Sequence, residues 1–133
     1  MDLATLDTGA DAATLHLKHP TTGQPLTTEN GEPITISLVS ADSERYRKAQ
    51  RQIINERANS NSRKVDAGEI ERSATRILIA AVASWQNIIL DGDALECTPG
   101  NIARVFNRLQ WVREQCDQFV NDRANFVKAS AQN

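Results

Sequence analysis

Apolar residues recur at three- and four-residue steps through one stretch of the chain, Ile77–Leu90. The first half of this stretch, from Ile77 to Ala83, is wholly apolar, so little of its surface can face water. The spacing is the period of an α-helix, and alanine is a strong helix former. A buried strand is the alternative, but the apolar pattern is longer than a typical strand. We therefore predict a central helix that begins after an Asp66 cap and continues to about Leu90.

Capping residues predict a first helix ahead of the central one. Ser40, Asp42 and Ser43 are all good N-caps, and the helix is expected to continue from there to about Asn59. Residues 59–62 are polar and rich in turn formers, so they are predicted to form an exposed linker between the two helices.

Two further helices are expected after the central one. The Asp91-Gly92-Asp93 sequence should stop the central helix, because glycine adopts a conformation that other residues resist. Thr98-Pro99 predicts a short third helix, with threonine as the cap and proline in the first turn. The last helix is expected over about 110–129, where apolar residues again lie on one side.

The N-terminal part alternates apolar and polar residues instead. Residues 14–18 and 34–38 show this two-residue period and are predicted to be strands with one buried face. Turn formers lie between them, so either a hairpin with a long loop or a meander through Gln24–Leu26 is expected. Two strands alone are marginally stable, so they must lie on the helices or pair through an open edge.

These elements predict a mainly α fold, at the margin of α+β. About four helices are expected, arranged around the central apolar one, and an N-terminal β-hairpin packs beside them. A length of 133 residues fits a single domain, 1–133, with a β-hairpin region at 14–39 and a helical region at 43–129. The first thirteen residues are small and acidic, and are expected to form a frayed tail.

Composition and charge narrow the classes of function. The chain is 40% hydrophobic and 24% charged, as globular proteins are, and its net charge of −2 argues against a general nucleic-acid binder. Cys97 and Cys116 lack a Cys-x-x-Cys spacing and are predicted to be reduced core residues. The N-terminus has neither the basic region nor the apolar run of a signal peptide, so a cytoplasmic location is expected.

The sequence offers weak candidates for metal binding and catalysis. His16 and His19 would face opposite sides of a strand, so shared metal ligation is unfavourable. Residues 91–96 carry three carboxylates but are half the length of a calcium-binding loop. The sequence has no glycine-flanked nucleophile elbow and no phosphate-binding glycine loop. We therefore predict no enzymatic activity, no metal and no cofactor.

A basic run between residues 43 and 64 is a candidate docking surface. It holds two glutamates, Glu44 and Glu56, against seven basic residues: Arg45, Arg47, Lys48, Arg51, Arg57, Arg63 and Lys64. Seven minus two gives a local charge of +5. A solvated helix face explains such a run, and the functional alternative is a contact with an acidic partner or subunit through Arg47 and Arg51, which share a helical face.

Large aromatic residues are the other candidates for partner binding. Trp85 and Trp111 are expected to be core anchors, although tryptophan also dominates the energetics of interfaces. Phe119 and Phe126 stand seven residues apart on one helix face, which would mark a binding groove if it were exposed. We hypothesise that Trp111, Phe119 and Phe126 anchor a partner along the last two helices.

The C-terminal half resembles a family of phage proteins. Three segments carry the resemblance: Trp-Gln-Asn-Ile-Ile-Leu-Asp-Gly-Asp-Ala-Leu-Glu-Cys-Thr-Pro-Gly-Asn at 85–101, Trp-Val-Arg-Glu-Gln-Cys at 111–116 and Asp-Arg-Ala-Asn-Phe-Val at 122–127. Over about residues 75–128 the chain is similar to the tail assembly chaperones of long-tailed (siphovirus-type) phages and prophages. In that family a tryptophan helix ends at an Asp-Gly turn, a Thr- or Ser-capped helix follows, and the last helix closes on an Asn-Phe pair.

The resemblance implies a role in tail assembly, in the cytoplasm of a bacterial host. Such chaperones bind the long tape-measure protein, keep it soluble, help to recruit tail-tube subunits around it, and are absent from the finished particle. The expected partners are therefore a tape-measure protein and a tail-tube protein, with a homo-oligomer possible. The alternatives are a structural virion component, such as a head–tail connector or minor tail protein, and a small DNA-binding regulator.

Overall fold

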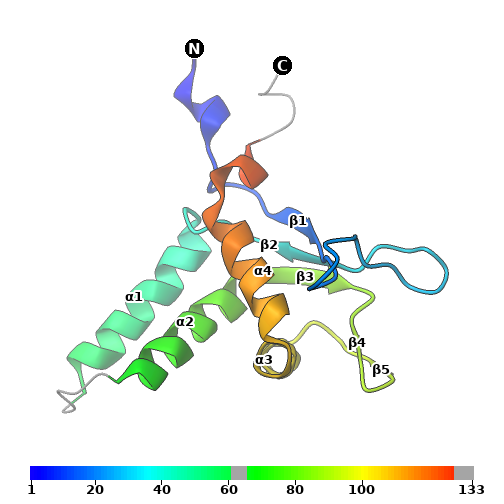
Figure 1. Ribbon diagram of the computed structural model, residues 1–133. Coiled ribbons are helices and arrows are strands. Elements are labelled where there is room, and N and C mark those ends of the chain that lie inside the picture. Colours follow the sequence, from blue (N-terminus) through cyan, green and yellow to red (C-terminus); the bar gives the residue numbers. More distant parts are fainter. Residues whose placement is uncertain (61–65, 128–133) are drawn as a thin grey trace.

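The computed structural model of the chain describes residues 1–60 and 66–127. Helices and strands are interspersed along the sequence, and a short 3-10 helix lies near each end of the described part (Figure 1). The elements follow one another in this order: η1 (Leu3–Leu6), β1 (Ala13–His16), β2 (Thr35–Leu38), α1 (Glu44–Ala58), α2 (Ala67–Ala81), β3 (Val82–Gln86), β4 (Ile89–Leu90), β5 (Asp93–Ala94), α3 (Pro99–Arg108), α4 (Gln110–Asn121) and η2 (Arg123–Phe126).

Three antiparallel strands form the main sheet, with β2 between β1 and β3. Leu15, Ile36 and Trp85 lie opposite one another across the sheet and pack on its core side. The other side is polar: Thr14 and Ser37 are register partners whose hydroxyl oxygens lie 3.2 Å apart. The hairpin that alternation predicted is therefore confirmed, and β3 completes the sheet within the same chain.

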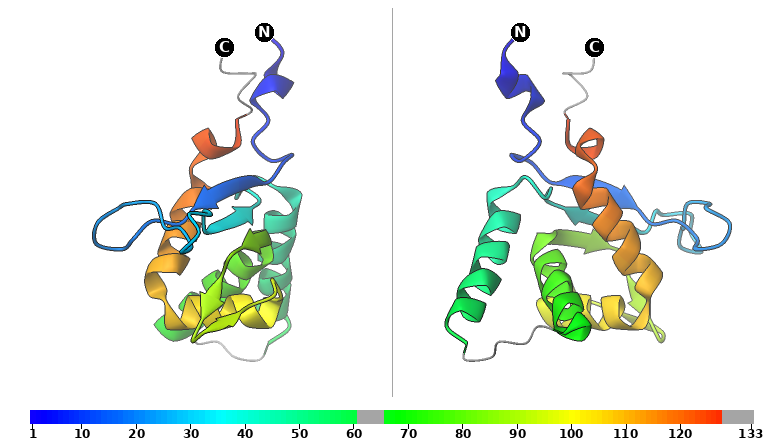
Figure 2. Two further views of the ribbon diagram at one scale, coloured as in Figure 1. Left: turned by 90° about the vertical axis from the view of Figure 1, so that its right-hand side faces the viewer. Right: turned by 60° about the vertical axis from the view of Figure 1, so that its left-hand side comes forward.

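The connection between β1 and β2 is a meander, which settles the choice left open by the sequence. The backbone N–H of Leu26 donates to the carbonyl of Leu17 at 2.8 Å, and the N–H of Ile34 donates to Leu26 at 3.1 Å. The N–H of Leu17 donates in turn to Ile34 at 3.0 Å. These bonds fold residues 17–34 into a compact loop, here called the 17–34 meander, which projects from the sheet (Figure 2).

A β-bulge interrupts β3. Leu38 lies opposite Val82 and Ser37 lies opposite Ser84, so Ala83 is an extra residue without a partner on β2. In a regular strand, residues three apart point to opposite faces. Because of the extra residue, both Val82 and Trp85 pack against the core, while Ala83 and Ser84 are exposed.

Helices α1 and α2 form a helical hairpin at one side of the molecule (Figure 2). The predicted caps are confirmed: Ser43 accepts a hydrogen bond from the N–H of Tyr46 at 3.1 Å. Asp66 accepts one from the N–H of Glu69 at 2.7 Å. Polar residues dominate α1, which buries Ile53, so α1 is fixed mainly through its contact with α2.

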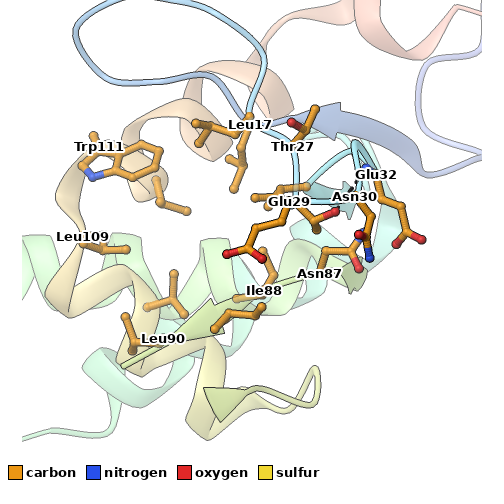
Figure 3. A pocket seen from close by; sticks show the side chains of 16 residues that line it. Leu17, Thr27, Glu29, Asn30, Glu32, Asn87, Ile88, Leu90, Leu109 and Trp111 are labelled. Carbon is orange, nitrogen blue, oxygen red and sulfur yellow. Dashed lines mark hydrogen bonds between the residues drawn. The ribbon is translucent and has the colours of Figure 1, made fainter. Parts of the chain in front are cut away.

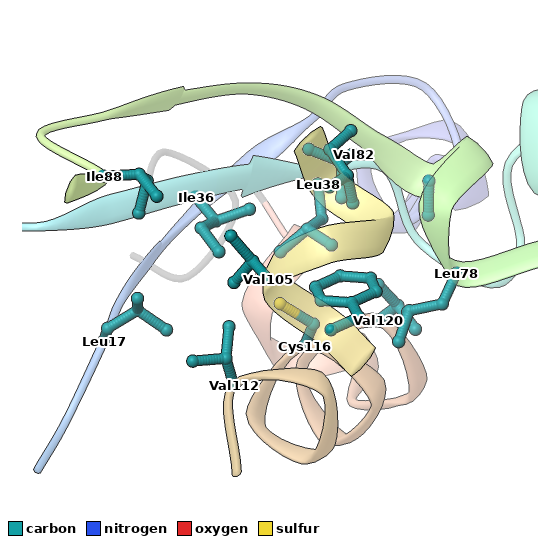
Figure 4. Packing of buried hydrophobic residues seen from close by; sticks show 13 residues of the cluster. Leu17, Ile36, Leu38, Leu78, Val82, Ile88, Val105, Val112, Cys116 and Val120 are labelled. Atoms are coloured by element: carbon teal, nitrogen blue, oxygen red, sulfur yellow. The ribbon is translucent and has the colours of Figure 1, made fainter. Parts of the chain in front are cut away.

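Helices α3 and α4 complete the core. Helix α4 packs against β2, α2 and α3, and the predicted Thr98 cap of α3 is present. Figure 4 shows Ile36 and Leu38 of the sheet facing Val112, Cys116 and Val120 of α4. Phe106 of α3 is fully buried within the same cluster. One cluster of apolar side chains therefore unites the sheet with three of the helices.

The predicted N-terminal tail is attached to the rest of the fold at Thr8, and residues 1–7 before it are exposed. The short helix η1 forms at Leu3–Leu6, and the hydroxyl of Thr8 donates to a carboxylate oxygen of Asp42 at 2.6 Å. The guanidinium of Arg123 binds the same carboxylate from η2, with contacts of 2.8 and 3.0 Å. Thr8, the residue before the cap of α1 and the start of η2 therefore meet at one pole of the molecule, and η1 projects away from it (Figure 1).

Two predictions from the sequence are wrong. The central helix ends at Ala81. Val82–Gln86 form β3, because β2 has a free edge with which they pair, and Ile89–Leu90 form β4. The last helix ends at Asn121 and gives way to η2, which Asp122 caps. Residues 61 and 62 of the expected linker and 128–129 of the expected last helix lie outside the described residues.

The outcome is a fold with both α-helices and β-sheet. Within residues 1–60 and 66–127 there are four α-helices, a three-stranded antiparallel sheet and a two-stranded hairpin. The sequence correctly predicts four helices and the N-terminal β-hairpin, but the arrangement around one long central helix is not found. Among the described helices, none combines the length and the apolar character needed to cross a membrane.

Candidate functional site

An open groove of about 730 Å³ lies where the 17–34 meander, β4 and the corner between α3 and α4 meet (Figure 3). We call it the apolar groove, because most of the side chains that line it are hydrophobic: Leu17, Leu26, Ile34, Ile88, Ile89, Leu90, Val105, Leu109, Trp111 and Val112. Its volume is within the range of known ligand-binding clefts, about 300–1,000 Å³.

The meander wall of the apolar groove is held by hydrogen bonds to two other elements. The side-chain amide of Gln115 on α4 binds both the N–H and the carbonyl of Lys18, at 3.0 and 2.8 Å. On the other side, Asn87 Nδ2 donates to the carbonyl of Pro33 at 2.8 Å. Asn87 has a φ of 65°, a left-handed conformation that asparagine tolerates better than most residues. The meander is therefore positioned by α4 and by the β3–β4 connection.

The opposite wall is the β4–β5 hairpin. Its two-residue turn is Asp91-Gly92, and φ is 52° and 87° at these positions, as a type I′ turn requires. The guanidinium of Arg108 at the end of α3 donates two hydrogen bonds to the Asp91 carboxylate, at 2.7 and 3.1 Å. These hydrogen bonds lower the pKa of Asp91. The Trp85 indole N–H donates to the carbonyl of Leu95 at 2.8 Å and ties the hairpin to β3.

The corner between α3 and α4 forms the end of the apolar groove. A single residue, Leu109, separates the two helices, and its backbone has left the helical conformation. Leu109 and Trp111 lie together at this end in Figure 3, and Trp111 is half-buried. Helix α4 begins at Gln110, as predicted.

Charge is confined to the other end of the apolar groove. Among the residues that line it, all of them in the described part, Glu29 and Glu32 are the ionisable ones. Figure 3 shows both glutamates beside Asn30 and Asn87, away from Trp111 and Leu109. The groove therefore has an apolar, aromatic end and an acidic, polar end.

The structure separates the aromatic residues that were predicted to act together. Trp111 lines the apolar groove, but Phe119 and Phe126 do not. These two phenylalanines pack edge to face, with ring centroids 5.4 Å apart, and Phe126 is only 6% exposed. They fasten η2 against α4, so their contact has a clear structural role. Trp85, the other tryptophan, lies in β3, not in a helix.

Arg47 and Arg51 lie on α1 and do not line the apolar groove. Both are exposed. Arg51 binds the Glu44 carboxylate, and this hydrogen bond lowers the pKa of Glu44, with a smaller contribution from the charge of Arg47. Part of the basic run is thus neutralised within α1 itself. Arg63 and Lys64, the end of the run, lie outside the described residues.

The histidines and cysteines have local roles. His19 Nδ1 lies 3.2 Å from the N–H of Thr21 and 3.3 Å from that of Thr22, so it accepts within a tight turn. Both cysteines are free; Cys116 is fully buried and Cys97 is half-buried. Across residues 1–60 and 66–127, no three His, Cys, Asp or Glu side chains gather where they could hold a metal ion.

Sequence reasoning missed most of the apolar groove, because its walls come from distant parts of the chain. Ile88, Ile89 and Leu90 were assigned to the central helix, although Asp91-Gly92 is a strong signal for a β-hairpin. That signal would have placed them in a strand. Nothing in the sequence indicates that the turn with Glu29 and Glu32 lines the same groove as Trp111.

The chain was compared with protein-family models, curated proteins and solved structures, and none of them matches.

Proposed function

We propose that this chain is a tail assembly chaperone of the type made by long-tailed phages and prophages. It binds a segment of the tape-measure protein in the apolar groove, keeps that protein soluble, and helps to recruit tail-tube subunits. It acts by binding without catalysis, in the bacterial cytoplasm, and leaves before the virion matures. Two things support the proposal: the similarity at residues 85–101, 111–116 and 122–127, and the groove itself.

The apolar groove is the observation on which the proposal depends. It exposes hydrophobic surface from three separate elements, and Ile89 in its lining is 61% exposed. Exposed apolar surface that is gathered in one concave site is typical of a surface that binds another polypeptide. Burying a side chain such as Ile89 against a partner would contribute about 1.5–3 kcal/mol to the free energy of binding.

The groove refines which residues serve as anchors. Trp111 keeps the role expected from the sequence, and Ile89 and Leu109 join it. Phe119 and Phe126 are assigned to the stability of the C-terminal end, because their rings pack on each other. Arg47 and Arg51 on α1 are proposed as a separate contact for a tail-tube subunit or a second copy of the chain.

Co-expression with the tape-measure protein tests the proposal. Without the chaperone that protein should aggregate, and with wild-type chain it should remain soluble and co-purify. Trp111→Ala and Ile89→Asp are expected to lose co-purification while remaining folded by circular dichroism. Ile70→Asp is the matched control, since Ile70 is 55% exposed, lies outside the groove, and stands in the first turn of α2, where a carboxylate is favourable.

The results separate the alternatives. If Ile89→Asp and Ile70→Asp both co-purify normally, the groove is not the binding site. Charge reversal of Arg47 and Arg51 should weaken only the contact with the tube protein. If assembly and self-association are both unchanged, these two arginines do not form a contact surface. Mass spectrometry of purified particles should not detect the chain. Its presence there would instead identify a structural virion component.

A further inference from the structure

The segment that binds in the apolar groove is cationic as well as apolar. Resting on the proposed function, we infer that it carries lysine or arginine beside its hydrophobic side chains, and that these cations face Glu29 and Glu32. The hydrophobic side chains then lie toward Leu109 and Trp111.

The first argument is the charge of the lining. Glu29 and Glu32 are the charged residues that line the apolar groove, and their carboxylates have no hydrogen bond or ion pair within the described part of the chain. Arg108, which binds the turn of the β4–β5 hairpin, does not line the groove, and its charge is matched by Asp91 at 2.7 Å. Nothing in the lining would therefore repel a cation or neutralise an incoming carboxylate.

The second argument is that the acidic end is preformed. The N–H of Gly31 donates to the carbonyl of Thr28 at 2.9 Å, and Gly31 has a φ of 82°, which closes the turn. The N–H of Glu32 donates to the Thr28 hydroxyl at 3.1 Å, and that of Thr28 to the Glu32 carbonyl at 2.8 Å. These bonds fix the backbone that carries the two glutamates before any partner arrives, so less backbone entropy is lost on binding.

The third argument concerns Asn87, which lies beside the glutamates (Figure 3). Its amide nitrogen donates to the carbonyl of Pro33 at 2.8 Å. One of its two amide N–H groups is thereby occupied, and its oxygen accepts no hydrogen bond within the described residues, so the oxygen is available to a donor on a ligand. An ammonium or guanidinium group donates several hydrogen bonds and accepts none, so it suits two carboxylates and an amide oxygen. A carboxylate in the same place would be repelled by both glutamates.

A pair of synthetic peptides tests the inference. One is a fluorescein-labelled amphipathic peptide of leucine and lysine, and its twin has glutamate in place of every lysine. Binding to the full chain is followed by fluorescence anisotropy at low salt. We expect the lysine peptide to bind more tightly, and Glu29→Lys with Glu32→Lys to weaken it about tenfold, because two exposed ion pairs are replaced by repulsion.

Matched variants separate local from general charge effects. Glu96→Lys with Glu114→Lys makes the same change in net charge at exposed positions outside the groove, and should leave the affinity of the lysine peptide nearly unchanged. A tenfold loss in this control would show general attraction to an acidic protein and overturn the inference. Added salt should also reduce the preference for lysine.

Two further outcomes distinguish this inference from the proposed function. If both peptides bind equally and both are lost in Trp111→Ala, the apolar groove binds polypeptide but the choice of a cationic segment is overturned. If neither peptide binds the folded wild-type chain, both the inference and the groove as a binding site are overturned.

Discussion

Gln115 binds the backbone of Lys18 through both ends of its side-chain amide. Oε1 accepts from the Lys18 N–H at 3.0 Å, and Nε2 donates to the Lys18 carbonyl at 2.8 Å. A side chain on α4 thus supplies the hydrogen bonds that a neighbouring strand would supply. Because Lys18 belongs to the 17–34 meander, this contact fixes one wall of the apolar groove to the helix that carries Trp111.

Gln115→Ala is expected to lower the free energy of unfolding by about 1 kcal/mol, because it removes two partly solvated hydrogen bonds. Amide exchange at Lys18 should become faster as the meander loosens. Urea unfolding and hydrogen exchange measure the two effects. Gln118→Ala is the control, since Gln118 is exposed on the same helix and makes no side-chain hydrogen bond among the described residues. Equal losses in the two variants would contradict the prediction.

Gly92→Ala should lower the free energy of unfolding by about 1 kcal/mol or more. Gly92 has a φ of 87°, and a side chain there is strained although nothing lies within 4 Å of its would-be Cβ. Gly100 has equally open surroundings but lies in the first turn of α3 without a positive φ. Gly100→Ala should therefore be neutral or slightly stabilising. Thermal and urea unfolding measure the stability of both variants. A similar loss of stability in the two would show that the positive φ of Gly92 is not the cause.

Stability should fall in acid through Asp42. Hydrogen bonds from Arg123 and Thr8 lower the pKa of Asp42 to about 2, against about 3.9 in an unfolded chain. Since the folded pKa is the lower one, the ionised carboxylate stabilises the fold above about pH 5, and this contribution is lost as the pH falls toward 2. We expect the ionised carboxylate to contribute only about 1 kcal/mol to the free energy of unfolding, because the Arg123 side chain is 75% exposed and solvent screens the pair.

Urea midpoints measured across this pH range test the contribution. Asp42→Asn should be less stable than wild type near neutral pH, and the two should converge in acid. In an Arg123→Gln background, Asp42→Asn should lower the free energy of unfolding much less than it does in the wild type. A constant difference between wild type and Asp42→Asn at every pH would rule out this linkage.

The two thiols should differ in reactivity. Burial raises the pKa of Cys116 to about 12, and its side chain is inaccessible in the folded chain, whereas Cys97 is half-buried. Near about pH 8 a thiol reagent should modify Cys97 in the native protein and reach Cys116 only after unfolding. Cys97→Ser should abolish the native reaction. Two equivalents of rapid labelling in the native state would contradict the prediction.

The elements that the sequence predicts well depend on local interactions. Ser43, Asp66 and Thr98 each accept a hydrogen bond from an N–H three residues ahead, so the start of each helix is encoded within one turn. The β1–β2 hairpin likewise follows from alternation along each strand. Local sequence patterns are sufficient to predict an element when the groups that stabilise it are close in sequence.

The central stretch was misassigned for a specific reason. Val82 and Trp85 are three residues apart and both pack against the core, which is the spacing of a helix. In the structure the bulge at Ala83 produces the same spacing within a strand. Pairing with β2 overrides the helix preference of the alanines, and that partner is distant in sequence. Most of the apolar groove was missed because its walls also come from segments that are distant in sequence. Trp111 is the lining residue that the sequence did single out.

The bulge also determines where the length of β3 can change. If one residue between Val82 and Trp85 were deleted, the strand would become regular, and both side chains would still face inward because they would then be two apart. Adding a residue there would move Trp85 away from its place opposite Ile36. Trp85 would turn to the polar face if the bulge stayed, or lie two positions further along β2 if the strand became regular, and its bond to Leu95 would break in either case. This strand therefore tolerates shortening by one residue but not lengthening.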